Sequence, residues 1–179
     1  MKEFLGKMKG GAQIPPRIVL SEILYSFIGG FIGIGICGYL SYFFFEPMEL
    51  TLIIGSMGAS AVLVYGAIKS PFAQPRNLLG GHIISGLIGV LSFQLLSGNI
   101  ILASAVAVSM AIALMALTKT VHPPGGATAL IAVIGGDKIH NLGFLYPFVP
   151  AGAGALILLL VALVTNNMAH NRKYPEYWF

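Results

Sequence analysis

The residues best suited to chemistry lie in Val121–Leu130, VHPPGGATAL, a run that interrupts an otherwise apolar sequence. His122 can contact a substrate, take up a proton or simply brace a turn, and Thr128 adds a hydroxyl donor. Prolines cannot donate a backbone hydrogen bond, and the residue before a proline avoids helical geometry. We therefore predict an extended entry through the prolines and a short helix from Ala127 onward. Broken backbone at membrane depth is tolerated only when buried in protein or lining a wet cavity, so this run is the predicted functional site.

A second run has the same pattern earlier in the chain. Gly58–Leu63 (GASAVL) aligns with Gly126–Ile131 (GATALI) at an offset of 68 residues, and Ser56 and Ser60 supply hydroxyls there. The same offset carries a whole later apolar segment onto an earlier one. This agreement in register predicts two copies of one structural unit.

The composition places both runs in a membrane. The 179 residues are 56% hydrophobic and only 9% charged, against about 25% charged in soluble domains. The basic residues form no stripe interleaved with aromatics, so we expect no nucleic-acid partner. Cys37 is the only cysteine, and the four histidines lack metal-ligand spacing, so we expect no metal, no cofactor and no enzymatic activity.

Apolar length predicts six transmembrane segments in an all-α fold. A span needs about 20 apolar residues. The second segment is interrupted by Gly55–Ser60 and the fifth by the prolines, so both are predicted to be discontinuous. Gly29 and Gly33 mark a helix-packing face on the first segment, and the Ala-rich fourth segment suits a crowded bundle interior. The predicted segments are Ile18–Phe45, Leu50–Ile68, Leu78–Leu96, Ile100–Leu117, Val121–Ile134 and Tyr146–Val164.

Charge favours a crossing by all six segments. With six crossings, nine of the ten basic residues lie on one side and only Lys138 lies on the other. Re-entrant second and fifth segments would reduce the bias to six against four. The positive-inside rule therefore predicts both termini in the cytoplasm, and three crossings per unit make the repeats inverted, as in many transporters. The nine are Lys2, Lys7, Lys9, Arg17, Lys69, Arg76, Lys119, Arg172 and Lys173.

Inverted repeats bring the two half-helices toward the midplane from opposite sides. Each helix N-terminus carries about half a positive elementary charge, and neither motif contains an acidic residue. The pair therefore favours a small anion. The predicted substrate contacts are His122, Pro123, Gly125, Gly126, Thr128, Ser56, Gly58 and Ser60, and the predicted electropositive pore mouth is Arg76, Asn77 and His82.

Each of these residues also has a structural interpretation. His122 could serve only to buttress the Pro-Pro turn, and His82 could serve only in packing. Arg76 could be an ordinary loop charge, and Ser60 and Thr128 could bond back to their own helices.

The motifs resemble the HPP family of integral membrane proteins. The resemblance rests on His122–Leu130, on Gly58–Ala61 and on Ser70–His82 (SPFAQPRNLLGGH), and it extends from the first span to the last. Members in cyanobacteria and chloroplast envelopes are linked to nitrite transport, which the resemblance implies for this chain. The family is often described with fewer than six spans, so the charge argument departs from that description.

The resulting prediction is a transporter of a small monovalent anion, and nitrite is the favoured substrate. The alternatives are a channel for another small anion or neutral solute, and a non-transporting scaffold or sensor subunit, in which the broken segments would be dry and packed.

We expect one transmembrane domain at 18–168, with repeats at about 18–97 and 100–168, between cytoplasmic segments 1–17 and 169–179. The expected setting is the plasma (inner) membrane of a bacterium, and the expected assembly is a homo-oligomer in the lipid bilayer.

Overall fold

The computed structural model describes residues 18–46 and 51–179, and every regular element in those two ranges is helical. The predicted N-terminal segment 1–17 and Leu50, where the second predicted segment begins, lie outside the described residues. Four helical stretches are long and apolar enough to cross a membrane, which confirms an all-helical, multi-pass membrane fold. They are Leu20–Phe45, Pro75–Leu96, Ile100–Leu117 and Gly143–Thr165.

The long stretches follow the predicted segments closely. The first consists of α2 (Leu20–Leu40) and a wider π-type turn, η1 (Ser41–Phe45), and α5 (Ile100–Leu117) has its predicted bounds. Helix α4 (Pro75–Leu96) begins three residues earlier than predicted because Pro75 occupies its first turn, where a proline is tolerated.

The last long stretch is bent. It comprises η5 (Gly143–Leu145), η6 (Pro147–Gly152) and α8 (Ala153–Thr165), and it follows the short helix α7 (Asp137–His140). Val149 lies within η6 and has non-helical dihedrals of φ −135° and ψ 115°. The next residue is Pro150, which disfavours helical geometry at the residue before it.

The predicted start of the helix in the VHPPGG run is wrong. Helix α6 spans Pro123–Ile134, so the two prolines and two glycines form its first turn and are not extended. Proline has a backbone φ suited to a first helical turn. The N–H groups of that turn have no acceptor within the helix, so proline, which lacks an N–H, breaks no hydrogen bond there. The extended residue is instead His122, with φ −137° and ψ 103°.

The second predicted segment is discontinuous at a different point. Helix α3 begins at Gly55, runs through the predicted break to Ala61, and continues as a π-type turn, η3 (Val62–Gly66). Before it, Ile54 is extended with φ −120° and ψ 153°. The short element η4 (Pro71–Ala73) then leads to α4. The chain thus enters α3 directly from extended backbone.

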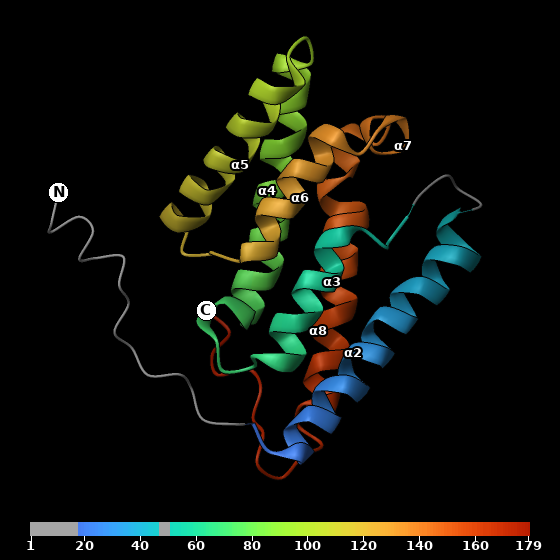
Figure 1. Cartoon of the computed structure of the whole chain (residues 1–179), viewed down its shortest axis with the longest axis vertical. Helices are drawn as coiled ribbons and strands as arrows, with labels where there is room; N and C mark the ends of the chain where they lie inside the picture. Colours follow the sequence, from blue (N-terminus) through green and yellow to red (C-terminus); the bar gives the residue numbers. More distant parts are fainter. Residues whose placement is uncertain (1–17, 47–50) are drawn as a thin grey trace, which may run out of the picture.

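The helices form two groups that meet at the short helices. Helices α4, α5 and α6 pack together, α2, α3 and α8 pack together, and the groups meet where α3 contacts α6 and α4 contacts α8. Figure 1 shows α3 and α6 beginning near the middle of the molecule and running toward opposite ends. Their starts, Gly55 and Pro123, are separated by 68 residues, which is the offset of the sequence repeat.

Small residues line the closest contacts, as predicted. Gly29 and Gly33 are buried, and a Cβ added at Gly33 would lie within 2.8 Å of the Tyr65 ring. On α5, Ala103, Ala107 and Ala111 form a buried stripe against α4 and α6. Such residues let helix backbones approach closely in lipid.

Candidate functional site

Four polar side chains meet in the interior, and none is exposed at all. The Ser60 hydroxyl of α3 lies 2.7 Å from Nε2 of His82 on α4 and 2.8 Å from Nε2 of His122, the residue before α6. Nδ1 of His82 lies 2.7 Å from the Thr128 hydroxyl of α6. We call Ser60, His82, His122 and Thr128 the central cluster. It joins α3, α4 and the segment that begins α6 by side-chain hydrogen bonds.

The direction of each hydrogen bond follows from one acceptor. Nδ1 of His122 lies 2.7 Å from the Phe72 carbonyl oxygen, which can only accept, so this nitrogen carries a proton. When both imidazoles are neutral, Nε2 of His122 must accept from Ser60. Ser60 then accepts from Nε2 of His82, and Nδ1 of His82 accepts from Thr128. The cluster is therefore a hydrogen-bonded chain with one polarity.

The start of α4 holds the segment that carries His122. The Arg76 guanidinium donates to the Thr118 carbonyl at 2.8 Å, and the Asn77 amide donates to the Val121 carbonyl at 2.8 Å. Both side chains had been predicted at a pore mouth. In the structure they fix the backbone that leads into α6.

Two glycines let α4 approach His122 and α6. A Cβ added at Gly81 would lie 2.5 Å from the Cβ of His122, and one added at Gly125 would lie 2.6 Å from the Ser85 hydroxyl. Gly125, predicted as a substrate contact, therefore lies at a close helix-packing contact in the structure. Gly81 has the same role on the facing helix.

The other predicted site residues lie apart from the cluster. Pro123 and Gly58 are exposed, and an added Cβ at Gly58 would contact nothing within 4 Å. Gly126 is half-buried. Ser56, one turn before Ser60, is fully buried, and its hydroxyl has no hydrogen-bond partner among the described residues. His82, predicted at the mouth, instead joins the centre of the cluster.

The start of α6 offers fewer donors than we predicted. Its first two residues are prolines without an N–H, and the N–H of Gly125 donates to the His122 carbonyl at 2.7 Å. The three leading positions therefore present no free backbone donor. Side chains supply the polar groups at this point.

Sequence reasoning missed the backbone and phenol partners of the cluster. The Phe72 carbonyl orients His122, and the Tyr146 hydroxyl donates to the Thr128 carbonyl at 2.9 Å. Neither residue carries a recognisable pattern, because Phe72 acts through its main chain and Tyr146 sits at the edge of an apolar run. His82 is the fourth member of the central cluster. The two glycines directly before it, in the GGH sequence, were the sequence feature that could have pointed to it.

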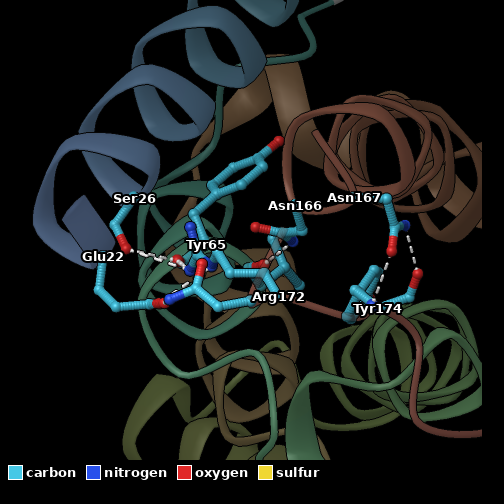
Figure 2. A network of polar contacts seen from close by, with 9 residues as sticks. Glu22, Ser26, Tyr65, Asn166, Asn167, Arg172 and Tyr174 are labelled. Carbon is cyan, nitrogen blue, oxygen red and sulfur yellow. Dashed lines mark hydrogen bonds and ion pairs between the residues drawn. The ribbon is translucent and has the colours of Figure 1, made fainter. Parts of the chain in front are cut away.

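A second polar network joins the C-terminal segment to α2 and η3, as Figure 2 shows. Arg172 pairs with Glu22 at 3.1 Å and donates to the Tyr65 carbonyl at 2.6 Å and the Ser26 hydroxyl at 3.3 Å. Asn166 donates to the Val64 carbonyl at 2.8 Å. We call these residues the end network. It satisfies carbonyls at the end of the helix formed by α3 and η3, where a cation is favoured.

The rest of the C-terminal segment is also packed. Tyr174 exchanges two backbone hydrogen bonds with the Asn167 amide, and its hydroxyl donates to the Ala73 carbonyl at 2.6 Å. Burial raises the pKa of the Tyr174 phenol, so it remains a donor. The predicted tail is thus anchored to the connection between η3 and α4.

Two open cavities lie at opposite ends of the helix formed by α3 and η3. One of about 520 Å³ reaches Gly55 at its start and is also lined by Lys138. The other, about 880 Å³, reaches Gly66 at its end and is lined by Lys69 and Arg172. The first cavity is also lined by Glu46 and the second by Glu22, so each has both a basic and an acidic residue in its wall. Among the described residues, no group of three or more His, Cys, Asp or Glu could hold a metal ion.

A family model described as HPP, transmembrane region, matches residues 15–175, which include all the helices described above. The chain belongs to the HPP family. The family match covers both short helices and the whole central cluster. Its description assigns the region to the membrane and names no substrate.

Two Dictyostelium discoideum proteins, each described only as a transmembrane protein, are similar to this HPP chain. One is 46% identical over 180 residues and the other 44% identical over 181 residues. Each alignment covers 99% of this chain but 58% or 62% of the relative, so the chain spans about three fifths of their length. No solved structure matches the chain.

Proposed function

We propose that this HPP protein transports a small monovalent anion, nitrite above all, through a site between α3 and α6. The observation that carries the proposal is the central cluster, which places two histidines and two hydroxyls in a membrane interior. Polar and ionisable groups are costly inside a membrane and typically mark substrate or proton pathways. Family resemblance selects nitrite among the anions that such a site would accept.

The charges around the cluster favour an anion over a cation. Helices α3, α4, α5, α6 and α8 contain no Asp or Glu. A cation site would need carboxylates or exposed carbonyls. The buried Ser56 hydroxyl has no hydrogen-bond partner in the part of the chain that the structure describes, and it lies one turn from Ser60. It is a donor available to a bound anion.

The arrangement of the helices supports six crossings in two inverted repeats. Helices α3 and α6 run in opposite directions from the middle of the molecule (Figure 1). Each group of three packed helices combines a long and a short helix of one repeat with the last long helix of the other. With the charge bias, this arrangement favours both termini in the cytoplasm. The two cavities would then open on opposite sides.

A non-transporting scaffold is the second candidate. One observation favours it, because all four cluster side chains are buried and hydrogen-bonded to protein. A site that transports must open to water at some stage. Transport therefore requires a conformation in which α3 and α6 separate from α4, whereas a scaffold would stay closed.

Nitrite uptake into liposomes containing the purified protein tests the proposal. We expect uptake above the protein-free background, a large loss in His122→Ala, and no loss in His170→Ala, which changes an exposed histidine. Folding of each variant is checked by its thermal unfolding in detergent. If the wild type moves no nitrite, nitrate, formate or chloride, the scaffold is the correct interpretation.

Assembly and cellular location remain predictions. We expect a homo-oligomer, because the helix formed by α3 and η3 exposes small residues such as Gly58 and Gly66, whose added Cβ atoms would contact none of the described residues within 4 Å. Such surfaces favour contact between helices in lipid. We also retain the plasma membrane of a bacterium as the expected location.

A further inference from the structure

The central cluster can take up one proton and keep every hydrogen bond. We propose that His82, Ser60 and His122 form a proton relay, which couples one proton to each anion carried. This inference rests on the proposed function and adds the coupling ion to it. It makes the protein a symporter of protons and anions that moves no net charge.

The first step places the proton on His82. A hydronium ion from surface water in the open conformation gives its proton to Nδ1 of His82, and a water molecule leaves. The Thr128 hydroxyl then turns its hydrogen to the Pro124 carbonyl, which lies 3.3 Å away. The Thr128 oxygen is now free to accept from Nδ1 of His82, at the existing distance of 2.7 Å. Because the Pro124 carbonyl is available as a second acceptor, Thr128 can change from donor to acceptor toward His82, and it is therefore the switch of the relay.

The second step moves the charge to His122. The Nε2–H bond of His82 breaks as the proton passes to the Ser60 oxygen, and the original Ser60 proton passes to Nε2 of His122. The donor–acceptor distances for these two transfers are 2.7 Å, from Nε2 of His82 to the Ser60 oxygen, and 2.8 Å, from the Ser60 oxygen to Nε2 of His122. His82 ends neutral with its hydrogen on Nδ1, and His122 carries the positive charge. Both end states keep all the hydrogen bonds, so they differ little in contacts.

Among the described residues, no carboxylate is hydrogen-bonded to the central cluster. The titratable or basic groups nearest to it on the packed elements and their connections are Tyr65, Lys69, Arg76, Lys119 and Tyr146. Helix α2 packs on α3 and carries Glu22 in its first turn, where it pairs with Arg172. Helix α7 packs on α6 and carries Asp137, Lys138 and His140, which are exposed or half-buried beyond the end of α6. The phenols donate to backbone carbonyls, and the Arg76 guanidinium is turned to Thr118. A charge without a counter-ion is very costly in an apolar interior. A monovalent anion bound beside the imidazolium is the missing counter-ion, which gives one anion for one proton.

Initial rates of nitrite influx separate a symporter from a channel. Liposomes are given either a pH gradient, alkaline inside, or a membrane potential, positive inside, set with potassium and valinomycin. Protein-free liposomes measure unassisted permeation of nitrous acid, which is subtracted. We expect the pH gradient to raise the rate. A potential of about 59 mV, worth about tenfold in the equilibrium of a single charge, should leave the rate unchanged.

The outcomes distinguish this inference from the proposed function. Nitrite influx driven by the potential and indifferent to the pH gradient would overturn the relay and leave anion transport standing. Absence of influx for every anion tested would overturn anion transport itself. Thr128→Val, which keeps the side-chain shape but removes the switch, should abolish the response to the pH gradient, and Thr128→Ser should retain it. Equal responses in these two variants would also contradict the relay.

A measurement on the unmodified cluster guards against variants that misfold. Nitrogen NMR of histidine-labelled protein in lipid nanodiscs, with His140→Gln and His170→Gln to remove the other two signals, reports which ring nitrogen carries hydrogen. At high pH we expect hydrogen on Nδ1 of His122 and on Nε2 of His82. On acidification the two rings should take up one shared proton. The same tautomer in both rings, or two independent protonations, would refute the relay.

Discussion

The central cluster and the end network are both buried, yet they use opposite electrostatics. The central cluster has two histidines, two hydroxyls and no formal charge in its hydrogen-bonded neutral state. The end network contains a formal ion pair, Arg172 with Glu22, whose side chains are 2% and 26% exposed. A fixed charge is tolerated in the end network because water and helix carbonyls lie close enough to stabilise it. In the interior a permanent charge is costly, and the polar groups of the central cluster are neutral when hydrogen-bonded to one another.

The two regions also differ in how fully their polar atoms are paired. In the central cluster, each ring nitrogen has a partner between 2.7 and 2.8 Å away. In the end network, Nη1 of Arg172 has no hydrogen-bond partner within residues 18–46 and 51–179. Full pairing in the centre suits a relay that must lose no bond as protons move. The end network instead anchors the C-terminal segment through hydrogen bonds and an ion pair that involve charged groups.

The comparison predicts the largest loss of stability when the shared partner of both histidines is removed. Ser60→Ala leaves Nε2 of both rings unpaired, and each orphaned buried group costs about 1–3 kcal/mol. We therefore expect the free energy of unfolding in detergent to fall by about 3 kcal/mol. Ser92→Ala, at a buried serine of α4 outside the cluster, is the matched control. A loss no larger than that of Ser92→Ala would show that the cluster is not tightly paired.

Removing the cation of the end network should have the next largest effect. Arg172→Ala removes the hydrogen bonds to Ser26 and Tyr65 and the ion pair with Glu22, but Glu22 keeps the Asn171 amide at 3.0 Å and can still reach water. A hydrogen bond from a charged group is worth about 1.5–3 kcal/mol, so we expect a loss of stability of about 2 kcal/mol. Chaotrope unfolding measures it, beside Lys173→Ala at the exposed neighbouring residue. We also expect nitrite uptake to survive, and its loss would erase the distinction between anchor and site.

A loss of stability of similar size should follow from closing the space between α4 and His122. Gly81→Ala forces a methyl group against the Cβ of His122, and overpacking costs about 1–3 kcal/mol. The control is Gly35→Ala, since a Cβ there would meet nothing within 4 Å. It should be neutral or stabilising by up to about 1 kcal/mol through helix propensity. Thermal unfolding of the two variants in parallel tests the difference, and equal midpoints would contradict the close approach.

The smallest effect should come from the phenol next to the cluster. Tyr146→Phe removes one hydrogen bond to the Thr128 carbonyl, worth about 1 kcal/mol. Tyr177→Phe is the control, because its hydroxyl donates to the Pro71 carbonyl from an exposed position. Uptake assays would sharpen the comparison further, since the Tyr146 hydroxyl bonds to a main-chain carbonyl of the cluster and to none of its four side chains. We expect the pH dependence of uptake to remain in Tyr146→Phe, and its disappearance would place Tyr146 in the relay.

The chain's sequence alone determined the membrane class, the helical fold and the approximate extent of every long helix. Apolar length is a local property, so Ile100–Leu117 could be predicted at its observed bounds. The same holds for Gly29 and Gly33, whose spacing on one helical face predicts burial. The repeat offset of 68 residues anticipated where α3 and α6 begin relative to each other. It did not predict the starts themselves, because a first helical turn accepts prolines that its interior would reject.

Only the tertiary structure decided which polar residues meet. Ser60, His82, His122 and Thr128 are separated by up to 68 positions, and no local pattern relates His82 to the other three. Gly58 and Ser60 are two residues apart in one motif, yet they face opposite environments because successive helical residues point about 100° apart. The Phe72 carbonyl that orients His122 is invisible to side-chain patterns. Helix packing, through Gly81 and Gly125, brings these groups within bonding distance and so determines the chemistry.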